Sequence, residues 1–290
     1  MKRIYYSVLC LAALAVAACN KESAQAEGEA LCANAYISSP ATKTVYEIGN
    51  YGDKTGVKVS WDTAESFKAY YDGGAVPVVF SKTAAGTSFT AESVPEGVSV
   101  STSFTGLYGS AATLNSDGKI DIDFSKQNGE ADNLSAYDVM TATSMLNDGA
   151  LSFAFKHNCA ILRLKCINHY EKEISELKLD FKCAKLSDEF ASTCLTVMAY
   201  RQAASLSITL KKPVAAGSPV KDKGTVEYRY VIVPALKFKD SNYSGIGFAE
   251  ERFDKSITLS KTKSIEAGKV YDVVCHAGVE GDENGDVWAD

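Results

Sequence analysis

The chain has 290 residues, of which 46% are apolar and 23% are charged, and its formal net charge at pH 7 is -6. This composition is too apolar for a mainly disordered chain and supplies enough residues for one or two hydrophobic cores. The acidic balance offers no basic surface to a phosphate backbone, so nucleic acid is not expected as a partner. With three histidines and no Cys-x-x-Cys pair, neither a metal nor another cofactor is expected.

The first residues have the organisation of an export signal. Lys2 and Arg3 precede an uncharged stretch, residues 4–18, which is shorter than the ~20 residues of a membrane-spanning helix. Small residues stand immediately before Cys19, as in the lipobox of bacterial lipoproteins. We therefore expect residues 1–18 to be a lipoprotein signal peptide, Cys19 to carry the lipid anchor, and residues 19–30 to form a flexible tether. An ordinary secretory peptide with an incidental cysteine is the alternative.

Beyond residue 30, apolar side chains recur at every second position between clusters of Gly, Asn, Asp and Ser, a period typical of half-buried β-strands. In one clear case, the side chains of Val226, Tyr228 and Tyr230 should lie on the buried face, opposite Glu227 and Arg229. Strands are expected at 31–38, 57–61, 66–71, 76–80, 98–105, 120–124, 150–155, 159–167, 174–183, 205–210, 226–232, 256–260 and 270–276, and short helical turns at 131–137 and 187–192. The residues expected in the cores are Trp61, Phe153, Leu162, Leu164, Phe181 and Tyr230.

The spacing of these strands predicts an all-β fold with two β-sandwich domains in tandem. Residues 125–149 are polar with few strand signals, which makes them the candidate connection between the two domains. We expect an N-terminal domain at 31–148 and a C-terminal domain at 149–279. Residues 280–290 carry five acidic side chains and no basic one, so they are expected to form an acidic tail.

Five segments, in order along the chain, resemble those of a known family. They are the lipobox at Cys19; 41–44 (Ala-Thr-Lys-Thr) with 59–61 (Val-Ser-Trp) and 67–71 (Phe-Lys-Ala-Tyr-Tyr); Gln127 with 137–140 (Tyr-Asp-Val-Met); 151–157 (Leu-Ser-Phe-Ala-Phe-Lys-His); and 265–273 (Ile-Glu-Ala-Gly-Lys-Val-Tyr-Asp-Val). In these segments the chain resembles the fimbrillins, the Mfa-like major fimbrial subunit lipoproteins of Gram-negative anaerobes that form type V pili. It differs from the family pattern at Lys43, where arginine is usual, and at 107–110, where a Tyr-Pro pair is common.

The resemblance implies two transthyretin-like β-sandwich domains and a role as a pilus subunit or pilus-associated adhesin at the cell outer membrane. In that family the precursor is exported as a lipoprotein, a surface protease removes the first strand, and a strand from a neighbouring subunit fills the open groove. The implied partners are other pilus subunits, the membrane through the lipid anchor, and a host or microbial surface ligand. A monomeric surface lipoprotein that binds a glycan or a host protein is the alternative.

The two ends of the chain contain the residues that such an assembly would use. The apolar strand expected at 31–38 is followed by a loop that contains Lys43. Cleavage after Lys43 would leave Thr44 as the mature N-terminus and would require a protease that accepts lysine. At the other end, Val287 and Trp288 are candidate apolar anchors of a donor strand. A lipoprotein that keeps its first strand is the alternative.

No pattern in the chain points to catalysis, and we expect no enzymatic activity. His157, His169 and His276 have no Ser, Cys or Asp partner at a recognisable motif spacing. His157 lies where the fimbrillins have a histidine beside a core strand, and we expect it to be a structural hydrogen-bonding residue.

The cysteines of the mature chain are expected to be mostly free. Strands around Cys159 and Cys183 are predicted to form a hairpin in which these two side chains face opposite sides and cannot bond. Cys166, Cys183 and Cys275 fall on the inward sides of their strands, as small core thiols do.

Overall fold

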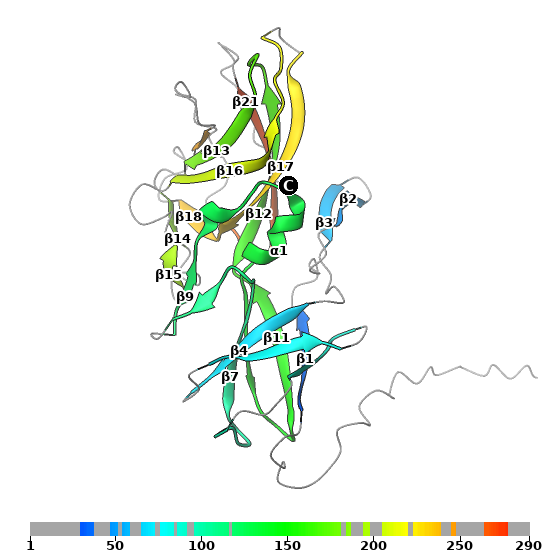
Figure 1. Ribbon diagram of the computed structural model, residues 1–290, viewed down its shortest axis with the longest axis vertical. Helices are drawn as coiled ribbons and strands as arrows, with labels where there is room; N and C mark the ends of the chain where they lie inside the picture. Colours follow the sequence, from blue (N-terminus) through cyan, green and yellow to red (C-terminus); the bar gives the residue numbers. More distant parts are fainter. Residues whose placement is uncertain are drawn as a thin grey trace, which may run out of the picture.

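The protein is a β-structure built around two hydrophobic cores (Figure 1). The computed structural model describes residues 30–37, 47–51, 54–58, 65–72, 76–83, 86–91, 96–115, 118–180, 184–186, 194–197, 205–219, 223–238, 245–247 and 264–277. Within these residues the helical structure is limited to η1 (Phe124–Lys126), η2 (Ala131–Asn133) and α1 (Leu134–Tyr137). The all-β class is therefore confirmed, as is the helical turn predicted at 131–137. In the part of the chain that the structure describes, no helix is long and apolar enough to cross a membrane.

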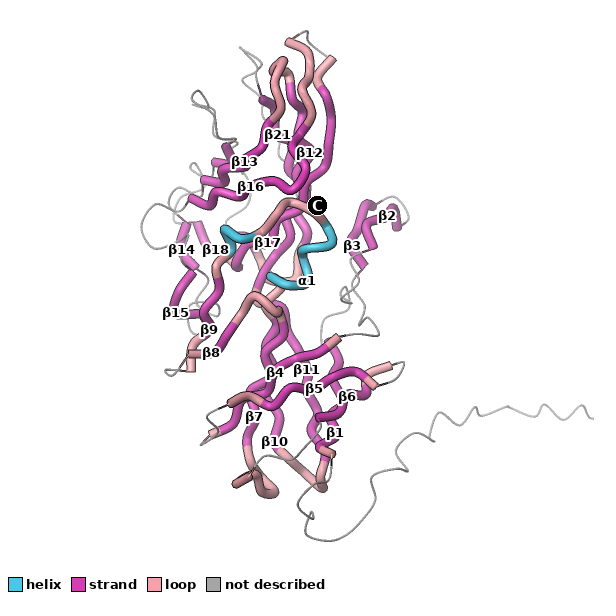
Figure 2. The backbone as a smooth tube through the Cα atoms, viewed as in Figure 1, coloured by secondary structure: helices cyan, strands magenta, loops and turns pink. Residues whose placement is uncertain are grey.

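Seven strands close into a barrel around the first core (Figure 2). The order around the barrel is β1, β11, β10, β7, β4, β5 and β6, and the pairing of β6 with β1 closes the ring. The sequence predicts a β-sandwich here, and the described strands form a closed ring because β1 is paired on both of its edges. The strands are β1 (Leu31–Ile37), β4 (Ser66–Tyr71), β5 (Val78–Lys82), β6 (Ser88–Ala91), β7 (Ser103–Tyr108), β10 (Met140–Met145) and β11 (Ala150–His157).

Phenylalanine rings fill the barrel. The centroid of the Phe67 ring lies 5.1 Å from those of Phe80, Phe89, Phe153 and Phe155. These rings are fully or almost fully buried, and their stacked and edge-on arrangements are those that aromatic quadrupoles favour. The first core therefore consists of large, rigid side chains that interlock.

Small sheets surround the second core. In one, β12 lies between β17, which is antiparallel to it, and β21, which is parallel. The other three-stranded sheets have the orders β16-β13-β19, β14-β18-β20 and β15-β9-β8. Apart from these, β2 and β3 form a two-stranded sheet of their own. The strands are β2 (Glu47–Tyr51), β3 (Lys54–Lys58), β8 (Thr113–Leu114), β9 (Ile120–Ile122), β12 (Cys159–Asn168), β13 (Ile174–Asp180), β14 (Ala184–Leu186), β15 (Cys194–Val197), β16 (Ser205–Val214), β17 (Thr225–Pro234), β18 (Leu236–Phe238), β19 (Gly245–Gly247), β20 (Ser264–Ile265) and β21 (Val270–Ala277).

The two hydrophobic cores do not divide the chain at 148/149, the predicted domain boundary, because the chain enters the second core before that point and then returns to the barrel. Ile120, Phe124 and Leu134 are buried in the second core, although they precede the predicted boundary. The chain then comes back through β10 and β11, which pair with each other and with barrel neighbours. β10 also lies inside the stretch predicted as a connection. The final passage to the second core occurs at Asn158, between β11 and β12.

The predicted hairpin between β12 and β13 is wrong. β12 pairs with β17 and β21, whereas β13 pairs with β16 and β19, so the two strands belong to different sheets. The Asn168 side chain donates to the backbone carbonyls of Lys172 and Ala215 and accepts from the backbone N–H of Tyr170. These bonds hold the connection as it crosses from one sheet to the other.

The face of β17 is reversed relative to the prediction. Val226 and Tyr228 are exposed and Tyr230 is half-buried, whereas Arg229 is only 5% exposed. The Arg229 guanidinium can be buried because backbone carbonyls of β16 accept its hydrogen bonds.

Of the other residues predicted in the cores, Phe153, Leu162 and Leu164 are buried. Trp61, the side chain of Phe181, the strand predicted at 256–260 and the turn predicted at 187–192 lie outside the described residues.

Candidate functional site

The candidate site is the position of β1 in the barrel. β1 runs parallel to β11, with Cys32 opposite Ala150 and Ile37 opposite Phe155. It runs antiparallel to β6, with Leu31 opposite Ala91. β1 is the element that joins β6 to β11, so these two would be edge strands without it.

The alternation of β1 sets its two faces. Leu31 and Ala35 are fully buried and Ala33 is 3% exposed, while Asn34 and Tyr36 point outward. Successive side chains of a strand point to opposite sides, so the odd-numbered residues enter the barrel and the even-numbered ones face its surface. This pattern confirms the apolar strand that the sequence predicts at 31–38.

The inward side chains of β1 are matched in size to their neighbours. Leu31 lies opposite Ala91 of β6, whereas Ala33 lies between Leu151 of β11 and Phe89 of β6. Ala35 lies opposite Phe153, which belongs to the phenylalanine cluster. β1 thus contributes backbone pairing on two edges and a row of one large and two small buried side chains, after which Ile37 packs partly buried against the same core.

β1 is held by contacts that a separate peptide could also make. Its ladder bonds and apolar contacts involve β6 and β11, both far from it along the chain. If the connection after β1 were cut, the strand would be held by these noncovalent contacts alone. Its loss would expose unpaired backbone groups on two strands together with an opened aromatic core, and a second strand of suitable sequence could restore both.

The residues that the sequence singles out for anchoring and processing lie outside the described part of the chain. These are Cys19 for lipidation, Lys43 and Thr44 for maturation, and Val287 and Trp288 for strand donation. Their roles remain predictions.

His157 forms a buried polar pair with Asp138 near the passage between the two cores. Its Nδ1 lies 2.9 Å from Oδ1 of Asp138, and its Nε2 is buried without a hydrogen-bond partner. Burial by itself lowers the pKa of His157, but the charge and hydrogen bond of Asp138 outweigh burial and raise it above its ordinary value. The ring also packs against Gly268, whose φ is +74°. These contacts agree with the structural role predicted for His157.

The other histidines do not add to that pair. Nδ1 of His169 lies 3.3 Å from the carbonyl oxygen of Ser218, and the side chain of His276 lies outside the described residues. Among the side chains that the structure describes, no group of three or more His, Cys, Asp or Glu residues is placed to hold a metal ion.

Two core cysteines agree with the prediction of free thiols. Cys166 and Cys275 are register partners on β12 and β21, and both are buried and free. Burial raises the pKa of Cys166 to about 12 and that of Cys275 well above its ordinary value, so neither thiol is reactive at neutral pH. The side chain of Cys183 lies outside the described residues.

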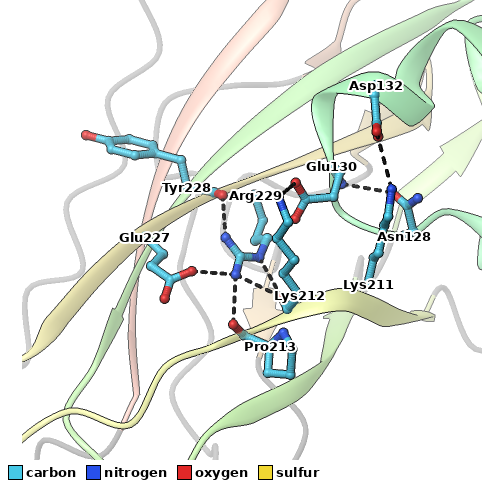
Figure 3. A network of polar contacts seen from close by, with 9 residues as sticks. All are labelled: Asn128, Glu130, Asp132, Lys211, Lys212, Pro213, Glu227, Tyr228 and Arg229. Atoms are coloured by element: carbon cyan, nitrogen blue, oxygen red, sulfur yellow. Dashed lines mark hydrogen bonds and ion pairs between the residues drawn. The ribbon is translucent and has the colours of Figure 1, made fainter.

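A polar network fixes the segment after η1 between two sheets (Figure 3). The backbone carbonyl of Asn128 accepts from the N–H of Lys211 on β16, and that of Gly129 accepts from the N–H of Tyr230 on β17. The Gln127 side chain accepts from the N–H of Ile232 at 2.7 Å and donates to its carbonyl at 2.8 Å. Gln127, one of the residues in the fimbrillin-like segments, therefore pairs with the edge of β17.

Arg229 lies at the centre of this network. Its guanidinium donates to the carbonyls of Lys212, at 2.8 Å, and Pro213, at 3.0 Å, and forms an ion pair with Glu227 (Figure 3). Burial raises the pKa of Glu227, but the Ala215 N–H and Arg229 outweigh it and keep that pKa below its ordinary value. Alternation alone places Arg229 on the exposed face, because the carbonyls that accept its hydrogen bonds belong to another strand, β16.

Comparison with known proteins finds similar solved structures, but no match at the level of the sequence. No protein-family model matches the sequence, and no curated protein matches it. Three similar solved structures are described as a candidate cell adhesion protein of Bacteroides uniformis, the fimbrial anchor protein Mfa2 of Porphyromonas gingivalis, and a fimbrial protein of Bacteroides ovatus.

The similarity to these structures is distant. The first is 16% identical, with 85% of this chain and 94% of the other covered and a TM-score of 0.48. Mfa2 is 11% identical, with 85% of this chain and 90% of Mfa2 covered and a TM-score of 0.37. The Bacteroides ovatus protein is 12% identical, with 89% of this chain and 50% of the other covered and a TM-score of 0.34.

Proposed function

We propose that this chain is a structural subunit or adhesin of a surface pilus, exported as a lipoprotein and assembled by exchange of its first strand for a strand of another subunit. The observation that carries the proposal is the position of β1. It completes a closed barrel from the N-terminal end of the described chain, with both of its edges paired to distant strands.

A strand in this position suits exchange for two physical reasons. Its contacts are backbone pairing and apolar packing, which an extended segment of another chain can supply. The open barrel would expose two strand edges and an aromatic core, which gives a strong drive to accept such a segment. Lys43 follows the strand in the sequence, and cleavage after it would separate the strand from the rest of the chain.

The remaining parts of the proposal follow the fimbrillin-like segments of the sequence. The two cores would be the two transthyretin-like domains of that family, and Cys19 would anchor the precursor in the outer membrane. After cleavage at Lys43, Val287 and Trp288 would contribute to contact with the next subunit. In this scheme the protein has no catalytic role and acts through extended contacts.

Immunogold electron microscopy of intact cells tests the proposal. An antibody against this chain should label surface fibres, and cells lacking the gene should lose that label. Label confined to the cell surface, together with purified mature protein that stays monomeric after limited proteolysis and binds a polysaccharide, would contradict the polymer and support the monomeric alternative.

A further inference from the structure

We propose that the β1 groove selects its incoming strand by side-chain size. It accepts one bulky aliphatic side chain at the position of Leu31 and only methyl-sized side chains at the positions of Ala33 and Ala35. The inference rests on the proposed function, since it names the kind of partner that can replace β1. The partner is an extended segment of another subunit with a large-x-small-x-small pattern on its inward face.

The first position is large because its neighbour is small. Leu31 is fully buried and lies opposite Ala91 on β6. An alanine at position 31 would leave a cavity next to another alanine, which large-to-small substitutions show to be unfavourable.

The second position is small because both of its neighbours are large. Ala33 has Phe89 beside it on β6 and Leu151 beside it on β11, and all three side chains are buried. All three side chains belong to one close-packed core, so a larger side chain at 33 would have to displace Phe89 or Leu151.

The third position, that of Ala35, is small because the neighbouring Phe153 ring has no free space into which it could move. Ala35 lies opposite Phe153 of β11, and Gly106 of β7 lies close to the Phe153 ring. A Cβ atom added at Gly106 would lie 3.0 Å from Cδ1 of Phe153 and 3.0 Å from Cζ of Phe155, so no free space lies behind these rings. A larger side chain at 35 would therefore have to displace a ring that is already packed against Gly106 and the neighbouring phenylalanines.

The outward positions carry no such restriction. Asn34 is exposed and Tyr36 is 46% exposed, so replacements there meet solvent rather than the core. Selection should therefore act on every second residue of the incoming strand.

Peptide exchange tests the selection without altering the barrel. The mature chain is given a specific protease site between Ala41 and Thr42, cut, and incubated in mild denaturant with fluorescent peptides covering residues 30–38. The wild-type peptide and an Asn34→Leu peptide should incorporate equally. Ala35→Leu and Leu31→Ala peptides should incorporate at least about tenfold less tightly.

The outcomes separate the two levels of the proposal. Equal incorporation of the wild-type and Ala35→Leu peptides would overturn size selection while leaving strand exchange intact. Failure of the wild-type peptide to incorporate into the cut chain would instead overturn strand exchange, and size selection with it.

Discussion

Replacing Arg229 by alanine should destabilise the fold strongly, although its position in the sequence suggests an exposed residue. Truncation would leave the carbonyls of Lys212 and Pro213 without their donor and the Glu227 carboxylate without its ion-pair partner. The guanidinium side chain is only 6% exposed, so water replaces little of what is lost.

The expected magnitude follows from the burial of the two partners. Breaking a buried pair by removing one partner costs roughly 3–5 kcal/mol. The Glu227 side chain is 30% exposed, and water will stabilise part of its charge. We therefore expect Arg229→Ala to lower the free energy of unfolding by about 3 kcal/mol, the low end of that range.

Urea unfolding can be measured for Arg229→Ala, Glu227→Gln and the double variant. The results give the loss in the free energy of unfolding and the coupling energy between the two side chains. Lys211→Ala is the matched control, because Lys211 is a cation of the same network whose contact with Asp132 is exposed, and its loss should stay within about 0.5 kcal/mol. A coupling energy above about 1 kcal/mol is expected. An Arg229→Ala variant no less stable than Lys211→Ala would refute the role given to the buried guanidinium.

Three further predictions address the core, the buried histidine and the anchor. Leu164→Ala should reduce the free energy of unfolding by about 2–5 kcal/mol, because Leu164 is fully buried, and a loss below about 0.5 kcal/mol in urea would mean that its strand faces the other way. The raised pKa of His157 means that the folded state binds its proton more tightly than the unfolded state, so the resulting stability is complete below about pH 6.5 and is lost as the pH rises through the raised value. The stability advantage of the wild type over His157→Gln should therefore be larger at about pH 5.5 than at about pH 8.5, and an unchanged difference would argue against the pairing with Asp138. Cys19→Ala should abolish membrane association of the chain in cell fractionation, and a variant that stays in the membrane pellet with unaltered processing would exclude lipidation at this residue.

Alternation predicts which side chains of a strand share a face, but it does not identify the neighbouring strands. For β1 it correctly places Leu31, Ala33 and Ala35 inward. The pairing of β1 with β6 and β11 involves residues far apart in the sequence, and no local signal encodes it.

The errors of prediction have physical causes. Alternation does not predict β10, because this strand has only two buried apolar side chains, Met140 and Ala142, among polar ones. Alternation places Arg229 on the wrong face, because the burial of Arg229 depends on carbonyls supplied by β16. The pairing of β10 and the burial of Arg229 both depend on contacts with distant strands, and periodicity along one segment does not reveal such contacts.

The most direct test of the account is mass spectrometry of the N-terminus of the protein recovered from the cell surface in assembled form. The proposal predicts that Thr44 is the first residue and that β1 is absent from the covalent chain. Recovery of every assembled chain with an intact, acylated Cys19 would contradict exchange of the first strand.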